Sequence, residues 1–335
     1  MRITNRMVTN QFIRSLNDMS LEMNRLNMQV ITGRKFSRSS ENTSAAVKGF
    51  RIRKDLSRAD SYLQNIDHAK ASLGDAESAL THINALMNTA EERILAGLNG
   101  TMSRETRSIL AEELSHLQEQ LYQTLNSSTA GSYYFGGTNT KVKPFSIGDD
   151  GKLVYNQAVL RDLTSAAADA LAKKSLFVDI GLDVQFDAGT GQLDERTVFA
   201  YSVPGLTVVG SGTKELSSGE NVSANLYDLL GELIGELESD SYTYDRADAL
   251  FGAFQEAKER IISAITGIGA KTSYLTFMSD RLEERQIGLK ERQLDVEGID
   301  PAEAIIHFES QKFAYSAALQ MGNQILQPTV FDFMK

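Results

Sequence analysis

The first long segment with a helical pattern covers residues 12–30. Its apolar residues recur in alternating steps of four and three, the spacing that keeps one face of a helix against another helix. They are Phe12, Leu16, Met19, Met23, Leu26 and Val30. Polar residues cover the other faces, so a single helix of this kind is not stable alone in water. The pattern therefore predicts an amphipathic arm that needs a partner.

A turn and a second, longer helix follow this arm. Gly33, within residues 32–35, is suited to end the first helix because glycine tolerates the left-handed conformation. Apolar residues then alternate in steps of four and three across residues 52–94, with only Lys70 interrupting the seam. This predicts a helix much longer than the helices of ordinary globular domains.

A third helix is expected after the glycines at residues 97–100. Ser103 is suited to cap it, with Glu105 in its first turn. Its leucine seam covers residues 110–125. Because the connecting loop is short, we expect this helix to fold back antiparallel on the second one.

The pattern changes from Tyr133 onward to short β-forming runs separated by turn signals. The predicted strands are residues 142–147, 152–155, 176–180, 183–187, 197–202 and 206–209. Residues 164–174 are predicted to form a short helix between them. We therefore expect a small, mostly β domain at residues 141–222, inserted into a helical frame.

Helical periodicity returns at residues 225–238 and continues in one heptad phase over residues 247–296. The seam of this long helix is mostly apolar in its first half. Three of the seam positions in its second half are the cationic residues Lys271, Arg285 and Arg292. Such side chains can lay their methylene stems along an apolar seam or pair with acidic neighbours.

A last helix is expected to begin at Pro301, because proline is favoured in the first turn and Asp300 is a good cap. Its predicted seam contains Ile305, Phe308, Tyr315, Leu319 and Leu326, with Lys312 and Gly322 at the remaining seam positions. This is a second arm with an uncovered face.

The order of the elements is symmetrical: arm, long helix, β insert, long helix, arm. Pairing the two arms is the simplest way to cover both seams. The sequence thus predicts a mainly α fold with a β-rich insert, an elongated helical rod domain and paired terminal coiled-coil arms. The expected parts are the terminal arms at residues 1–40 and 300–335, the rod at residues 45–140 and 225–298, and the insert at residues 141–222.

The charge is distributed unevenly along the chain. The net charge is −10, yet residues 1–58 hold 12 Lys and Arg against 4 Asp and Glu, a local charge of +8 that leaves −18 on the remainder. A basic segment can bind nucleic acid, but these cations lie along a heptad helix and the loop after it. A solvated helix face is the favoured interpretation.

No residue pattern indicates a catalytic centre or a metal site. The chain has no cysteine, which removes disulfides, thiolate ligands and thiol catalysis. The histidines lack the spacing of a metal site; they are His68, His82, His116 and His307. The Gly210-x-Gly212 pair lacks the third glycine of a nucleotide-binding loop. The acidic residues 187–195 do not follow the ligand order of an EF-hand. The sequence also has no GxSxG nucleophile elbow of a hydrolase. We expect no enzyme and no cofactor.

The first thirty residues have no continuous apolar segment followed by a small-residue cleavage site, so we expect no secretory signal peptide. No apolar run in the sequence reaches the length needed to span a bilayer. If the protein leaves the cell, another export route is expected.

Several short motifs indicate a narrower class of protein than the helical periodicity does. The chain starts Met-Arg-Ile-Thr-Asn-Arg-Met, and an aromatic-Phe-Gly-Gly segment and a Pro-Phe pair follow the third helix. The motif residues are Thr32, Gly33, Phe135, Gly136, Gly137, Pro144 and Phe145. With the two-arm pattern, they resemble the flagellin superfamily over residues 1 to about 145 and about 225 to 335, and within it the proteins of the hook–filament junction.

The resemblance implies a structural subunit of the bacterial flagellum, exported unfolded by the flagellar type III apparatus and assembled outside the cell into a ring that joins hook to filament. It implies four partners: other copies of the chain, the first hook-associated protein, flagellin, and a cytoplasmic export chaperone that binds the C-terminal arm. Neither nucleic acid nor membrane insertion is implied. The two arm seams would then make the assembly contacts.

Other interpretations of the sequence are a minor flagellin that forms filament, a coiled-coil adhesin whose β domain binds a ligand and, more remotely, a helical enzyme. A minor flagellin would polymerise into long filaments by itself, and an adhesin would have arms that form stable trimers in solution.

Overall fold

The computed structural model describes residues 2–98, 102–187, 189–216 and 219–325 of the 335-residue chain. The chain divides into two compact units. Unit 1 comprises residues 1–60 and 283–335, and unit 2 comprises residues 61–282. The inserted residues 141–222 fall within unit 2 together with most of the helical frame. The three-part division expected from the sequence stays a prediction.

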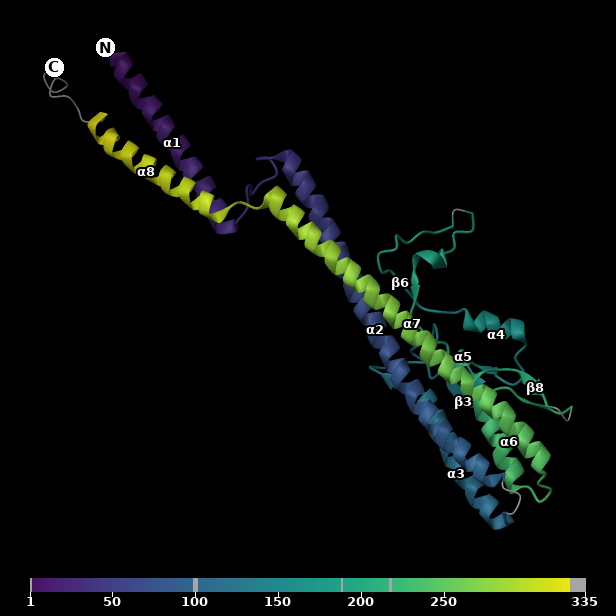
Figure 1. The fold of residues 1–335 in the computed structure, drawn as a ribbon. Helices are drawn as coiled ribbons and strands as arrows, with labels where there is room; N and C mark the ends of the chain where they lie inside the picture. Colours follow the sequence, from purple (N-terminus) through teal and green to yellow (C-terminus); the bar gives the residue numbers. More distant parts are fainter. Residues whose placement is uncertain (1, 99–101, 188, 217–218, 326–335) are drawn as a thin grey trace. The chain divides into compact units, whose positions relative to one another are not determined.

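Six long helices build most of the described chain, in the order expected from the periodicity (Figure 1). They are α1 (Arg2–Thr32), α2 (Thr43–Gly97), α3 (Arg104–Leu125), α6 (Leu226–Glu238), α7 (Tyr244–Glu297) and α8 (Pro301–Ile325). The expected mainly α fold with a β-containing insert is confirmed.

The predicted helix boundaries rest on capping chemistry that the structure shows. Ser103 Oγ accepts a hydrogen bond from the Thr106 amide at 3.3 Å, and Asp300 Oδ1 accepts one from the Ala302 amide at 2.8 Å. Gly33 has φ +67° just after α1 and donates its amide to Gln29 O at 2.8 Å.

The core of unit 2 lies between the inner faces of α2, α3, α6 and α7. α3 runs antiparallel to α2, as expected. Gly97 lies near Leu110, and one turn earlier on α2 Arg93 pairs with Glu113, which is further along α3, at 2.8 Å. α3 also lies along α6, a partner that the periodicity did not reveal.

The inserted part of unit 2 forms four small antiparallel sheets, with strand orders β1-β2, β3-β4-β5, β6-β7 and β8-β9. The strands are β1 (Ser128–Thr129), β2 (Ser132–Tyr133), β3 (Phe145–Ile147), β4 (Leu153–Tyr155), β5 (Ala158–Val159), β6 (Phe177–Val178), β7 (Phe199–Ala200), β8 (Thr213–Glu215) and β9 (Asn221–Ser223). Two short helices, α4 (Ser165–Ala172) and α5 (Gly205–Val209), and a 3-10 turn, η1 (Glu195–Thr197), lie between them. The helix expected near residues 164–174 is confirmed as α4.

Two predicted strands are wrong. Residues 206–209 form α5, because the Pro204 carbonyl accepts hydrogen bonds from the Thr207 amide at 3.1 Å and its Oγ1 at 2.7 Å, which closes a helical turn. Residues 183–187 make only an isolated bridge, between Phe186 and Leu193.

The inward face of α7 differs from the predicted seam near its C-terminal end. Arg285 and Arg292 are exposed, and Gln286 and Glu297 are buried instead. An α-helix has 3.6 residues per turn, so a strict seven-residue repeat drifts by about 20° per heptad. Along α7 this drift moves the inward position by one residue. Lys271 keeps its seam position, and burial lowers the pKa of its amine.

Phe145 anchors the insert in the core of unit 2. It is fully buried, and its ring centroid lies 5.1 Å from that of Tyr155 on the neighbouring strand. Tyr155 Oη donates a hydrogen bond to Phe135 O at 3.1 Å, and burial raises the pKa of Tyr155 to about 12. A Cβ at Gly205 would lie 2.5 Å from Phe145 Cζ, so the ring occupies space that only glycine leaves free.

Truncating this anchor should destabilise unit 2. We expect Phe145→Ala to lower the free energy of unfolding by about 3–5 kcal/mol, because it removes a fully buried aromatic ring and leaves a cavity. Ile147→Ala, on the same strand but exposed, should change it by within about 0.5 kcal/mol. Urea denaturation followed by circular dichroism measures both values, and equal losses would contradict this assignment.

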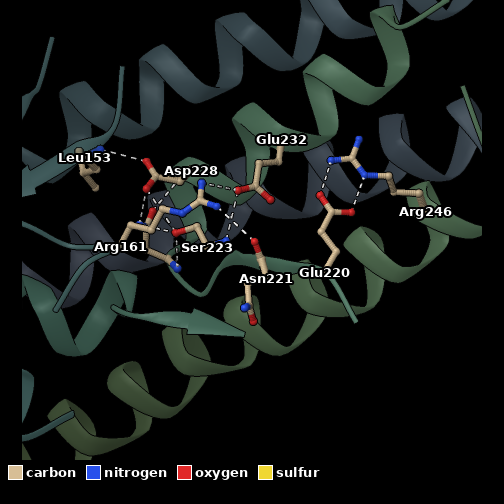
Figure 2. Close-up of polar contacts among 9 residues, drawn as sticks. Leu153, Arg161, Glu220, Asn221, Ser223, Asp228, Glu232 and Arg246 are labelled. Carbon is tan, nitrogen blue, oxygen red and sulfur yellow. Dashed lines mark hydrogen bonds and ion pairs between the residues drawn. The ribbon is translucent and has the colours of Figure 1, made fainter. Parts of the chain in front are cut away.

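A polar network joins β4 and β9 to α6 (Figure 2). Asp228 accepts hydrogen bonds from the Leu153 amide at 2.9 Å and from Ser223 Oγ at 3.3 Å. Glu232 accepts from Arg161 Nη1 at 3.0 Å and from the Ser223 amide at 3.2 Å.

The carboxyl groups of this region differ in their surroundings. Burial raises the pKa of Glu232 above its ordinary value, because it outweighs the hydrogen bond from Ser223 and the charge of Arg161. Arg246 donates to both oxygens of the exposed Glu220, at 3.0 and 2.9 Å, and holds the pKa of Glu220 below its ordinary value (Figure 2).

These opposite shifts predict opposite pH dependences of stability. A raised folded-state pKa means that the folded protein binds the proton more tightly, so the contribution of Glu232 falls as pH rises from 4.5 through its folded-state pKa. The free energy of unfolding of the wild type minus that of Glu232→Gln should therefore be larger at about pH 4 than at about pH 7. For the matched variant Glu220→Gln the same difference should be larger at the higher pH. Chemical denaturation at both pH values tests this, and shifts of the same sign would refute it.

Candidate assembly surface

The two arms form a helix pair within unit 1. α1 and α8 lie side by side, and Gln311 Nε2 donates a hydrogen bond to Met19 O at 3.4 Å (Figure 1). The pairing that the sequence suggested as the simplest cover for both seams is present in the structure.

Phe12 of α1 lies directly against Gly322 of α8. A Cβ at Gly322 would lie 2.6 Å from Phe12 Cζ, closer than carbon atoms approach, so no larger residue fits without moving the ring. Glycine inside a helix costs about 1 kcal/mol relative to alanine. Here the missing side chain leaves the space that the Phe12 ring occupies.

The seam predicted for α1 faces its partner. Leu26 is its most buried member, with 9% of its surface exposed, and the other five residues are half-buried. The structure therefore brings all six of them to one side of α1. Their contacts with other copies of the chain stay a prediction.

The face that α8 turns toward α1 differs from the predicted seam at alternate positions. It consists of Ala304, Phe308, Gln311, Tyr315, Ala318 and Gly322. Phe308 and Tyr315 are half-buried as predicted, whereas Ile305 and Leu319 are 49% and 47% exposed. Ala304 and Ala318, one position before Ile305 and Leu319, face α1 instead. Their small side chains let the helices approach closely, and Ile305 and Leu319 then point outward. Leu326 lies outside the described residues.

The outer faces of the pair carry large apolar side chains. On α1 these are Met7, Val8, Ile13, Leu21, Met28 and Ile31, and on α8 they are Ile305, Ile306, Phe313, Leu319 and Met321. Phe313 is 75% exposed. Scattered apolar residues are normal on a surface, but stripes along both helices of a thin pair mark an interaction surface.

The base of the pair is held by backbone hydrogen bonds from the α1–α2 linker to the end of α7 and from the α7–α8 linker back to Gly33. The Lys35 amide donates to Glu297 O at 2.7 Å, and the Ile299 amide donates to Gly33 O at 3.1 Å. Lys35 Nζ also donates to Asp295 O at 2.8 Å. Gly33 and Lys35 thus tie the link between α1 and α2 to the end of α7 and the link after it, whereas Thr32 Oγ1 donates to Met28 O within α1.

The remaining motif residues lie in unit 2 and are structural. Phe135, Gly136, Gly137, Pro144 and Phe145 are all buried, around the hydrogen bond from Tyr155 to Phe135 O. A Cβ at Gly136 would lie 2.5 Å from Asn139 O, which explains that glycine. The structure does not bring this motif into the arm pair.

The histidines are exposed, as expected: His68, His82, His116 and His307. In the part of the chain that the structure describes, no three His, Asp or Glu residues gather as metal ligands would. No helix within the described ranges combines the length and apolarity needed to cross a membrane.

Comparison with known proteins gives the class to which this fold belongs. Residues 3–140 match the bacterial flagellin N-terminal helical region. Among solved structures, a flagellar hook-associated protein from Vibrio parahaemolyticus superposes with a TM-score of 0.60 over 77% of this chain and 100% of that one, at 18% identity. Flagellar hook associated protein-3 from Legionella pneumophila superposes with a TM-score of 0.57 over 73% and 98%, at 13% identity. At these identities the structures show a shared fold.

Two curated relatives are more specific. Flagellar hook-associated protein 3 of Escherichia coli K12 is 21% identical over the full length of both chains. The protein of that name from Salmonella typhimurium is 27% identical over 50% of this chain and 53% of its own length. The resemblance to the flagellin superfamily, and within it to hook-associated protein 3, is confirmed.

Filling the space at Gly322 should loosen the arm pair. We expect Gly322→Val to raise the rate of amide hydrogen exchange in both α1 and α8, because the added side chain displaces the Phe12 ring. Gln320→Val introduces the same residue at an exposed position of the same helix and should leave exchange in α1 unchanged. Hydrogen exchange with mass spectrometry distinguishes the two, and unchanged exchange in both variants would show that the close approach does not hold the pair.

Proposed function

We propose that this protein is a structural subunit of the bacterial flagellum that forms the junction between hook and filament. The observation that carries the proposal is the α1–α8 pair, whose inner faces are covered while apolar stripes on both helices are left exposed. The likeness to hook-associated protein 3 over the whole chain supports the same role.

The physical logic is that of a subunit completed by its neighbours. Two paired helices bury little surface, so the arms gain most of their stability when further helices cover the outer stripes. Lateral packing of arms from successive copies would form a ring outside the cell.

The proposed partners are other copies of the chain, the first hook-associated protein on the hook side, flagellin on the filament side, and an export chaperone on the C-terminal arm. Absence of cysteine supports export in an unfolded state by the flagellar type III route, because no disulfide has to be broken or avoided. In this role the protein performs no catalysis.

The decisive experiment is deletion of the gene followed by complementation. Without the gene we expect intact hooks, no attached filaments and flagellin in the medium, observed by electron microscopy and immunoblotting. Restoring the wild-type gene should restore filaments. Normal filaments on the deletion strain would refute the proposal.

Leu26→Asp should be secreted but should fail to restore filaments, because it places a charge in the most buried part of the α1 seam. Ser15→Asp adds the same charge on the exposed polar face of α1 and should restore motility. Swimming assays and immunoblots of the medium separate assembly from export. Full motility with Leu26→Asp would show that the seam is not packed in the assembly.

A further inference from the structure

A cleft in unit 1 remains unexplained by the arm pair. It has a volume of about 590 Å³ and is lined by residues of the 34–39 segment, by the first turns of α2 and by Glu297. Its apolar lining consists of Phe36, Ala46, Val47 and Phe50. Val47 and Phe50 are 53% and 64% exposed, so the lining faces solvent.

Cations surround this lining: Arg34, Arg38, Arg51, Arg53 and Lys54. Arg53 pairs with the buried Glu297 at 2.8 Å. Within the described residues, the other four form no ion pair with a carboxylate of this chain. The cleft therefore presents an apolar strip inside a net positive rim.

This combination limits the kind of occupant. Duplex nucleic acid is held through its phosphates and gains little from exposed aliphatic side chains such as Val47. A helix face that carries several acidic residues around an exposed apolar one satisfies both the rim and the lining.

Such a face is present on α3. Its outward positions are Glu105, Ile109, Glu112, His116 and Glu119, in steps of four, three, four and three. Ile109 is 59% exposed in the middle of the acidic residues. Across the described residues Glu105, Glu112 and Glu119 form no ion pair, whereas the adjacent Glu113 pairs with Arg93.

We propose that the cleft of one copy binds the acidic outer face of α3 of a second copy. The inference rests on the proposed assembly, which brings copies together. Two different surfaces of one chain make a heterologous contact, and contacts of that kind generate rings or helical arrays. Exposed ion pairs are individually weak, so this contact forms between subunits that the arms already hold close together.

Disulfide trapping tests the proposal, because the chain has no cysteine of its own. Val47→Cys and Ile109→Cys, on copies with tags of different mass, are expressed together in the deletion strain, and flagella are isolated and oxidised. We expect a disulfide-linked heterodimer. Each chain carries one cysteine, so no link within a chain can form. Val142→Cys, exposed to 57%, replaces Ile109→Cys as the matched control and should give no heterodimer.

Charge reversal adds a second measurement. Arg51→Glu with Lys54→Glu on the Val47→Cys copy should reduce the heterodimer at least severalfold. Glu105→Arg with Glu112→Arg on the Ile109→Cys copy should then restore it. All of these side chains are exposed, and circular dichroism checks that the variants fold.

The outcomes separate this inference from the proposed function. Filaments and motility without a heterodimer would overturn the inference and leave the junction role intact, whereas the deletion experiment tests the junction role alone. An excess of homodimers linked through Val47→Cys would assign the cleft to a self-complementary contact instead. Tight binding of a duplex DNA oligonucleotide that Arg51→Glu with Lys54→Glu abolishes, without a heterodimer, would assign it to nucleic acid.

Discussion

Two helices that lie side by side can bury only one face each. In unit 1 this limit applies to α1 and α8: Leu26 is nearly buried, whereas Phe313 and the other outer apolar residues stay in solvent. Unit 2 does not share the limit, because four helices enclose its core and side chains such as Ile83 and Leu114 are fully buried. The same heptad chemistry therefore gives a complete core in one unit and an incomplete one in the other.

The order of residues on α8 further reduces the apolar surface that the pair of α1 and α8 buries. Alternate positions of its inner face are small, at Ala304, Ala318 and Gly322, and the isoleucines and Phe313 lie elsewhere on the helix. A sequence selected only for the stability of the isolated pair would place its largest apolar residues inward, since each buried one contributes about 1.5–3 kcal/mol. Placing them outward lowers the stability of the monomer and supplies contact area to neighbours.

The long helices, their caps and the arm pairing were predictable, because heptad spacing over many turns is a strong signal and Ser103 and Asp300 carry cap chemistry. The exact inward face of α8 was not predictable, because the large apolar residues Ile305 and Leu319 also fit a heptad and give a stronger signal than Ala304 and Ala318 beside them. On α7, the drift of a straight helix against a seven-residue repeat explains the exchange of Arg285 for Gln286.

The insert gave the weakest prediction for a related reason. Strands of two or three residues are too short for an alternating pattern to develop, so the sequence does not predict β1, β2, β5, β8 or β9. Residues 206–209 fit a strand or a helix equally well by their apolar pattern, and backbone hydrogen bonds to Pro204 O and Leu206 O close the helical turn of α5. The buried network at Asp228 and Glu232, which fixes β9 against α6, depends on contacts between distant residues that no local pattern contains.

Glu297 connects the parts of unit 1. Its carbonyl accepts the Lys35 amide at the base of the arm pair, and its buried side chain pairs with Arg53 at the rim of the cleft. Gly49 is required beside it, because a Cβ there would overlap the Glu297 carboxylate. A charge buried in this way is stable only while its partner stays in place, since the unpaired carboxylate would lose its compensation for desolvation. Any occupant that draws Arg53 toward solvent therefore acts on the residue that also fixes the base of the arms, so that the cleft and the arm pair share one structural element.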